Sequence, residues 1–424
     1  AGQFPYAAAA LHEYTGTGGG ASIRVISLPF GLSSIQSSAK ALSVRTEMLY
    51  EVLQYFNHPD NPGNVQGVPD LQMSTAVSAY TDPGPVSICV LPDGSGIGFD
   101  GAFGPGGAAV DATITVELVD GGGMPIANFP ATDLRLETTS GGLLNCAVGG
   151  SADRDTDVSG QTVFRSALSG GGWSGSGELL QIYVNEDPLT SSQGLDIRFN
   201  SPDINGDLVV DLADVVLFTG DFFGGAYAYR SDFLWDGIVN LGDIVYLSTG
   251  IGRRCPELEG VIRLPDSARA RMGIFFDESA ASVCSVGVAP GTSVSAYLCL
   301  LDPADATGVA GWECAVEVGG NAVLQTVTPR GQAYNVANPE RGFAVGLNTP
   351  LPSGDVVVLA DLELFYAGPD SSAVLLGPLD PSSNTPPLPS YVTGAGEFLP
   401  VWPMSGNFAT PAAVINGACP GPGI

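Results

Sequence analysis

The chain between residues 86 and 200 alternates apolar and polar side chains, as strands with one buried face do. Residues 111–118 read DATITVEL, in which every second side chain is apolar. Clusters of Gly, Asp and Ser separate this stretch from further short apolar runs at 161–168, 179–184 and 195–199. Short strands with regular turn signals predict an antiparallel β-sandwich over residues 86–200.

The same alternation returns after residue 256 and predicts a second antiparallel β-sandwich over residues 256–424. Residues 294–301 and 312–318 alternate, and a longer strand pattern covers 356–366. The tail from about 377 is rich in Pro and Gly and includes the run PPLP. We expect this tail to wrap the surface in an extended conformation.

The N-terminal segment, residues 1–85, shows one helix pattern and one strand pattern. Apolar residues recur at three- and four-residue spacing between 38 and 56, which predicts a helix. Residues 21–30 are strand-like and follow a glycine-rich run at 15–20. A strand on such a tether either pairs within its own chain or adds to the open sheet edge of a neighbouring molecule. In the second case, the segment is an assembly element.

A twelve-residue motif occurs twice between the two predicted sandwiches. Residues 203–214 read DINGDLVVDLAD and residues 232–243 read DFLWDGIVNLGD, so the second copy starts 29 residues after the first (position 232 against 203). Short oxygen-bearing side chains at alternate positions suit calcium, which takes six to eight hard oxygen ligands from a loop of EF-hand type. Each copy of the motif is predicted to continue into a helix, at 212–218 and at 241–247.

The spacing predicts two calcium ions, each held by one loop. The first loop offers the side chains at positions one, three, five, nine and twelve and the carbonyl at position seven, and the second offers the same set without position three. The predicted ligands are Asp203, Asn205, Asp207, the Val209 carbonyl, Asp211 and Asp214 in the first loop, and Asp232, Asp236, the Ile238 carbonyl, Asn240 and Asp243 in the second.

The duplicated loop-and-helix unit, across residues 201–255, resembles the type I dockerin module of secreted bacterial multiprotein systems. The resemblance implies a compact pair of helices with two calcium ions and a cohesin-type partner. Two departures stand out: Leu208 replaces the glycine of the first loop's sharp turn, and Leu234 removes the third-position ligand of the second. The pairs that carry partner recognition, often Ser-Thr in dockerins, are Leu212-Ala213 and Leu241-Gly242 here.

The flanking regions also resemble known modules. Residues 116–123 and 157–162 are similar to strands and turns of immunoglobulin-like modules in bacterial surface proteins. Residues 308–313 and 356–366 are similar to strands of a cohesin-like sandwich. The expected organisation is therefore an N-terminal segment (1–85), an immunoglobulin-like sandwich (86–200), a dockerin-like calcium module (201–255) and a cohesin-like sandwich with a Pro/Gly-rich tail (256–424).

Charge narrows the function classes. The chain has 44 acidic and 15 basic residues among 424, a net charge of -29, which repels nucleic acid and anionic lipid and favours hard cations. No apolar run is long enough for a membrane-spanning helix. A start at Ala1 without a methionine or signal sequence suits a mature exported product.

Cysteine usage points to an oxidising compartment. Seven cysteines lie far apart with no CxxC pair, and the chain has two histidines, so zinc and iron–sulfur sites are not expected. Dispersed cysteines in an acidic, β-rich chain favour disulfides, with at least one thiol left over. The best-guess bridge joins Cys89 and Cys146, because each lies near one end of the same predicted sandwich.

The sequence shows no catalytic constellation, so no catalytic residue and no enzymatic activity are predicted. His12 and His58 have no nucleophile beside them, and the GIGFDG string at 96–101 does not open a helix after a strand. Among the acidic residues no pair is singled out for glycoside cleavage.

The sequence therefore predicts a secreted or cell-surface calcium-binding structural protein that assembles with copies of itself into a filament or array. Two roles for the calcium module stay open: docking on the sandwich of the next molecule, which would propagate a filament, or acting as a rigid spacer within one chain. An alternative function is a non-catalytic adhesive or carbohydrate-binding component of a cohesin–dockerin-linked complex.

Overall fold

The computed structural model describes residues 68–419, apart from 148, 193, 260–261, 263–269 and 305, together with the strands β1 (Ala10–Tyr14) and β2 (Ile23–Ser27). These two strands form an antiparallel hairpin, so the strand predicted at 21–30 pairs within its own chain. The helix predicted at 38–56 lies outside the described residues.

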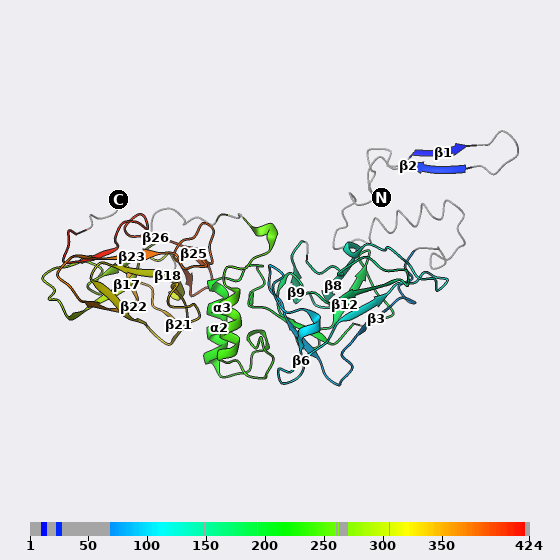
Figure 1. Cartoon of the computed structure of the whole chain (residues 1–424), viewed down its shortest axis with the longest axis horizontal. Coiled ribbons are helices and arrows are strands. Elements are labelled where there is room, and N and C mark those ends of the chain that lie inside the picture. The colour runs from blue at the N-terminus through cyan, green and yellow to red at the C-terminus, as the bar shows by residue number, and fades with distance from the viewer. Residues whose placement is uncertain are drawn as a thin grey trace.

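The N-terminal lobe consists of short strands in four small sheets (Figure 1). The sheet orders are β10-β7-β3, β11-β9, β13-β12-β8 and β14-β4-β5-β6. All pairs are antiparallel except β14 with β4. The strands are β3 (Thr75–Ser78), β4 (Val86–Cys89), β5 (Ala102–Phe103), β6 (Ala109–Val110), β7 (Ile114–Glu117), β8 (Leu134–Thr138), β9 (Leu143–Asn145), β10 (Gln161–Phe164), β11 (Gly170–Gly172), β12 (Leu180–Val184), β13 (Asp187–Pro188) and β14 (Ile197–Asn200).

The C-terminal lobe is a sandwich of a five-stranded and an eight-stranded sheet (Figure 1). The first has the order β19-β22-β17-β15-β26; the second runs β16-β27-β23-β18-β21-β20, with β24 on β18 and β25 on β24. The strands are β15 (Arg271–Phe275), β16 (Cys284–Ser285), β17 (Thr292–Leu301), β18 (Val309–Gly319), β19 (Ala322–Pro329), β20 (Ala333–Asn335), β21 (Phe343–Leu351), β22 (Val356–Tyr366), β23 (Ser372–Gly377), β24 (Ser390–Thr393), β25 (Phe398–Pro400), β26 (Trp402–Pro403) and β27 (Ala413–Ile415).

The mainly β fold class predicted from the alternating pattern is confirmed. Ile114 and Val116 of β7 are fully buried, while Thr115 and Glu117 between them are half-buried. In the C-terminal lobe, β22 spans the residues predicted for it and buries every second side chain over much of its length. One face of each strand therefore enters the core of its lobe, as the period of two requires.

The tail does not wrap the surface, contrary to the expectation from its composition. Strands β24, β25, β26 and β27 all lie within it and pair into the two sheets of the C-terminal lobe. Tyr391, Val392 and Ile415 are at most 1% exposed. The Pro and Gly content of the tail indicates local turns only. The short strands form because partners far away in the sequence complete their backbone hydrogen bonds.

The two predicted helices are confirmed and lie between the lobes (Figure 1). Helix α2 (Leu212–Gly224) and helix α3 (Leu241–Gly250) each begin with a capping box, in which Asp211 and Asn240 cap the helix and the acidic residue three positions later bonds back. Neither is long and apolar enough to cross a membrane, and this holds for every helix in the described residues. We refer to residues 201–255 as the helical module.

The predicted disulfide between Cys89 and Cys146 is wrong, because Cys146 has a different partner. Cys146 bonds to Cys255 at the end of the helical module, and Cys284 bonds to Cys419 in the C-terminal lobe. Cys89, Cys299 and Cys314 are buried free thiols. Cys89 lies on β4 with its side chain in the core shared with α2 and α3. The first bridge thus ties the N-terminal lobe to the helical module.

Candidate metal centre

The two predicted loops adopt the same backbone conformation. At the fourth position, Gly206 has φ 74° and Trp235 has φ 50°, and at the sixth position, Leu208 has φ 68° and Gly237 has φ 91°. A left-handed residue is needed at both places in both loops, and only one of each pair is glycine. Leu208 therefore keeps the turn that its glycine counterpart makes in the second loop.

The carboxylates at the two ends of each loop are oriented by the same backbone hydrogen bonds. Asp203 accepts from the N–H groups of Asp207 and Leu208, at 3.1 and 2.8 Å, and Asp214 accepts from those of Asn205 and Asp211, at 3.1 and 2.8 Å. These are positions one and twelve of the loop. Both carboxylates therefore point into the loop interior.

The second loop repeats this pattern position by position. Asp232 accepts from the N–H groups of Asp236 and Gly237, at 3.1 and 2.9 Å, and Asp243 accepts from those of Leu234 and Asn240, at 3.2 and 2.8 Å. The duplication seen in the sequence is thus a duplication of structure, including the orientation of the end carboxylates.

Burial separates the end positions from the middle ones. Asp203, Asp214, Asp232 and Asp243 are 0% exposed, whereas Asp207 and Asp236, at position five, are exposed. Asp211, at position nine, is also buried and accepts from the Ala213 N–H as the cap of α2. Each loop therefore has a closed inner end and an open outer side.

The buried carboxylates carry raised pKa values. Burial, followed by the charge of Asp207, raises the pKa of Asp203 to about 7, and burial raises the pKa of Asp243 to about 6. The pKa values of Asp214 and Asp232 are also raised, again mainly by burial. In the described part of the chain, no arginine or lysine forms an ion pair with any of these four side chains. A positive charge in the loop would offset this cost.

The donor set fits calcium, although the side chains are not drawn together as tightly as bound ligands would be. Among described residues, one group of three acidic, Cys or His side chains has its ligand atoms within 4.8 Å of one another, and it contains the bonded sulfurs of Cys146 and Cys255 beside Glu257. The predicted calcium ligands do not form such a group. They offer hard oxygen ligands, which calcium prefers, and no thiol or imidazole.

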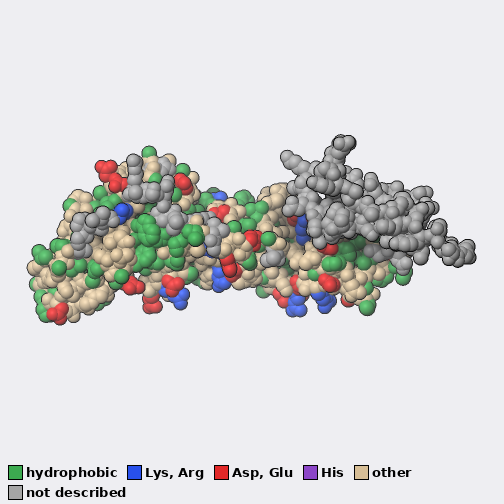
Figure 2. Space-filling view, turned by 90° about the horizontal axis from the view of Figure 1, so that it is seen from above, with side chains coloured by type: hydrophobic (Ala, Val, Ile, Leu, Met, Phe, Trp, Pro, Cys, Tyr) green, Lys and Arg blue, Asp and Glu red, His purple; other side chains and the backbone are tan. Residues whose placement is uncertain are grey.

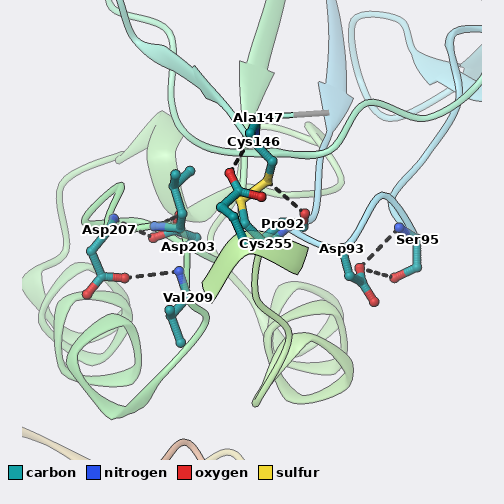
Figure 3. Close-up of a disulfide and its surroundings, with 11 residues drawn as sticks. Pro92, Asp93, Ser95, Cys146, Ala147, Asp203, Asp207, Val209 and Cys255 are labelled. Carbon is teal, nitrogen blue, oxygen red and sulfur yellow. Dashed lines mark hydrogen bonds between the residues drawn. A yellow bond between two sulfur atoms is a disulfide. The ribbon is translucent and has the colours of Figure 1, made fainter. Parts of the chain in front are cut away.

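Both loops pack against the N-terminal lobe at glycines. A Cβ atom added at Gly171 would lie 2.7 Å from Cγ of Asp203, and one at Gly107 would lie 3.3 Å from Cβ of Asp236. Asn200 donates to the Asp232 carbonyl at 2.5 Å. Figure 3 shows Asp203, Asp207 and Val209 beside the disulfide that joins this lobe to the helical module. The loops are therefore part of an interface.

Helix α2 packs on the opposite lobe, across strands β18, β21 and β24. Gly311 of β18 and Gly346 of β21 are register partners, and the helix crosses them. A Cβ atom at Gly311 would lie 2.6 Å from Cγ2 of Val216, and one at Gly346 would lie 2.7 Å from the Val215 carbonyl oxygen. We call the surface around these two glycines the glycine face. The helix approaches it closely because neither glycine has a side chain.

Sequence reasoning missed the glycine face and Glu313. A glycine inside a strand is a signal for close backbone approach, but nothing in the sequence pairs Gly311 with Gly346. Glu313 of β18 is 0% exposed, and burial raises its pKa to about 8, with the charge of Asp211 adding to the effect. It accepts hydrogen bonds from Ser383 and Ser382.

Among the described residues, the charged side chains on the face shown in Figure 2 do not gather into one large patch. On the face shown in Figure 2, acidic and basic side chains lie in small groups between uncharged surface. An ion pair between two exposed side chains, such as that of Arg165 with Asp100 at 2.9 Å, contributes little to stability.

No protein-family model matches the chain, and no curated protein matches it in sequence. Among solved structures, it is similar to a cohesin module of a family 33 glycoside hydrolase from Clostridium perfringens, with 13% identity over 32% of this chain and 92% of that one and a TM-score of 0.23. The sixth cohesin of scaffoldin B from Acetivibrio cellulolyticus is 12% identical over 36% of this chain and 100% of that one, with a TM-score of 0.24. A non-cellulosomal cohesin from Archaeoglobus fulgidus is 12% identical over 32% of this chain and 86% of that one, with a TM-score of 0.22. At these TM-scores the likeness has no weight for function.

Proposed function

We propose that the chain is a non-catalytic, extracellular structural protein in which two calcium ions stiffen a helical joint between two β lobes. The observation that carries this proposal is the pair of equivalent loops, each with two buried end carboxylates held by the same hydrogen bonds and without a basic partner. A bound divalent ion supplies the missing positive charge.

Each loop's own residues hold the ion. Asp203 and Asp214 provide the buried carboxylates of the first loop, with Asn205, Asp207 and the Val209 carbonyl on the open side. Asp232 and Asp243 do the same in the second, with Asp236, Asn240 and the Ile238 carbonyl. Leu234 contributes no side-chain ligand, so the second loop binds more weakly.

The joint role follows from the contacts of the helical module. Its loops touch the N-terminal lobe at Gly171 and Gly107, and α2 covers the glycine face of the C-terminal lobe. Filling the loops with calcium fixes the start of each helix, and α2 in turn fixes the C-terminal lobe. The two disulfides support placement outside the cell, where bridges persist.

Chelation tests the proposal. Removing calcium with EDTA is expected to lower the melting temperature, because 1 mM calcium at an affinity typical of extracellular modules contributes about 0.4 to 1.4 kcal/mol per ion. Calorimetric titration should show two ions for the wild type and one each for Asp214→Asn and Asp243→Asn.

Asp277→Asn is the matched control, since Asp277 also accepts backbone N–H bonds but lies in a turn of the C-terminal lobe. Its stoichiometry should stay at two. An identical melt in calcium and in EDTA, with no heat of binding, would exclude calcium as a structural ion.

A further inference from the structure

The two loops are preceded by different structures, although the loops themselves repeat. The first loop follows strand β14 directly, with Ser201 and Pro202 between the strand and Asp203. The second loop follows a connector, residues 225–231, that leaves the end of α2 and contains the 3-10 turn η5 (Tyr229–Ser231). A sheet strand therefore fixes the entrance of the first loop, whereas the entrance of the second loop needs another anchor.

Asp221 of α2 supplies that anchor. Its carboxylate accepts two hydrogen bonds from the Arg230 guanidinium, at 2.7 Å from Nε and 2.9 Å from Nη2, and a third from the Ser231 hydroxyl at 2.7 Å. The side chains of Asp221 and Arg230 are 13% and 32% exposed, and Ser231 is buried. A two-point contact between a guanidinium and a carboxylate fixes orientation as well as distance. The residue before the second loop is therefore bound to the last turn of α2.

The N-terminal lobe holds the same connector from its other side. The Tyr229 hydroxyl lies 2.9 Å from the Ser87 hydroxyl of β4. The Asn200 amide, at the end of β14, donates to the carbonyl oxygens of Tyr229 and Asp232, at 3.3 and 2.5 Å. The backbone of Asp232, the first predicted ligand of the second loop, is thus placed by a strand on one side and by α2 on the other.

The cluster of Asp221, Arg230 and Ser231 has no counterpart in the first copy of the repeat. The offset of 29 relates its members to residues without a charge: Asp221 to Gly250, Arg230 to Ser201 and Ser231 to Pro202. The second loop also lacks a side-chain ligand at Leu234, so it depends more on the placement of Asp232. A polar cluster that occurs beside the second loop alone points to a positioning role there.

We propose that Asp221, Arg230 and Ser231, which we call the anchor cluster, position Asp232 for calcium and couple the filling of the second loop to the placement of α2. The inference rests on the proposed function, since it assigns residues that act on one of its two ions. Groups that orient a metal ligand change metal affinity by about 10- to 100-fold when they are removed. Because Asp221 lies on α2, calcium in the second loop should in turn stabilise the end of that helix.

Arg230→Gln tests the proposal in two backgrounds of the full chain, each with one loop disabled. With Asp214→Asn, in which the second loop alone binds, Arg230→Gln is expected to weaken calcium binding about tenfold in calorimetric titration. With Asp243→Asn, in which the first loop alone binds, it should change the affinity less than about twofold. Arg165→Gln is the matched control, because it removes the exposed ion pair with Asp100 in the N-terminal lobe, and both affinities should stay unchanged.

Hydrogen exchange gives a readout that a purely structural ion pair would not move. Calcium added to Asp214→Asn should slow the exchange of the last amides of α2, residues 219–224, and Arg230→Gln should abolish that effect. Ser231→Ala removes one hydrogen bond of the anchor cluster and keeps the ion pair, so it should weaken the second loop by about threefold. It replaces Arg230→Gln in every comparison if that variant does not fold.

The outcomes separate this inference from the proposed function. Unchanged affinity of the second loop, or an equal loss in both backgrounds, would overturn the anchor role and leave calcium binding in place. Calcium that fills the second loop without slowing exchange at the end of α2 would overturn the coupling. If Asp214→Asn binds no ion while Asp243→Asn binds one, the second loop is not a calcium site and the inference is wrong. If neither background binds calcium, the proposed function itself is rejected.

Discussion

At the scale of single residues, Glu313 shows how a buried acid makes stability depend on pH. Its carboxyl lies at the contact between β18 and the start of α2, where burial raises the pKa from 4.5 to about 8. In the unfolded chain the group ionises near 4.5. Between these two values the folded state holds a proton that the unfolded state has lost, so stability falls as pH rises through this window.

Glu313→Gln is expected to remove that dependence, since glutamine fills the same space without a charge. The gain should be about 3 kcal/mol at pH 7 and close to zero at pH 4, where the acid is protonated in both states. Urea melts of the wild type and the variant at these two pH values measure it. An equal effect at both pH values would show that the substitution acts through packing or hydrogen bonding with Ser383.

At the scale of elements, the contact of α2 with its sheet depends on Gly311 and Gly346, which have no side chain. A methyl group added at Gly346 would meet the α2 backbone at Val215, and a helix backbone cannot give way as a flexible side chain does. Gly346→Ala is therefore expected to destabilise the chain by about 1 to 3 kcal/mol, through overpacking.

Gly377→Ala on β23 is the matched control, because a Cβ atom there would meet no other atom within 4 Å. Its melting temperature should match that of the wild type or exceed it slightly. If Gly346→Ala were equally silent, α2 would not lie on the glycine face as closely as described.

Local patterns predicted the elements well and their partners poorly. The run from Val356 to Tyr366 defines β22 because period two, length and apolar content all agree within one segment. The helices α2 and α3 could likewise be predicted at their starts, because the repeated motif and the apolar residues that follow it lie within one short segment. Such signals lie within a few neighbouring residues, and for the same reason the duplicated loops could be predicted from the sequence.

Long-range partners left no comparable signal. Cys146 pairs with a residue 109 positions away, and only the placement of the helical module beside the N-terminal lobe brings the two together. Val392 reads as part of a loop-rich tail, yet it becomes a buried strand residue through pairing with β18. Pairing between residues so far apart in the chain depends on how the lobes assemble, and no short segment of the sequence shows this.

At the scale of the whole molecule, the Cys146–Cys255 bridge holds the helical module to the N-terminal lobe. It is supported by the Arg253–Asp93 ion pair, at 2.5 Å. Replacing both cysteines by serine is expected to cost about 2 to 5 kcal/mol. Hydrogen exchange should rise in the helical module, whereas removal of Cys284–Cys419 should raise exchange within the C-terminal lobe alone. Uniform exchange changes in both variants would contradict this division.

The calcium-free molecule should lose stability as pH rises, in contrast to the usual behaviour of surface carboxylates. The pKa of Asp203 is raised from 3.8 to about 7 and that of Asp243 from 3.8 to about 6, so between pH 4 and these values the folded state binds more protons than the unfolded state. Its free energy of unfolding therefore falls as pH rises through that window.

Calcium should reverse the trend, because it binds the ionised carboxylates and competes with the protons. Melting temperatures measured from pH 4 to pH 8 are expected to decline in EDTA and to stay level or rise in excess calcium. Asp203→Asn with Asp243→Asn removes two of the titrating groups and should make the EDTA curve less steep, leaving the slope due to Asp214, Asp232 and Glu313. Parallel curves in EDTA and calcium would mean that these carboxylates do not bind the ion, and that the joint between the lobes is stabilised without calcium.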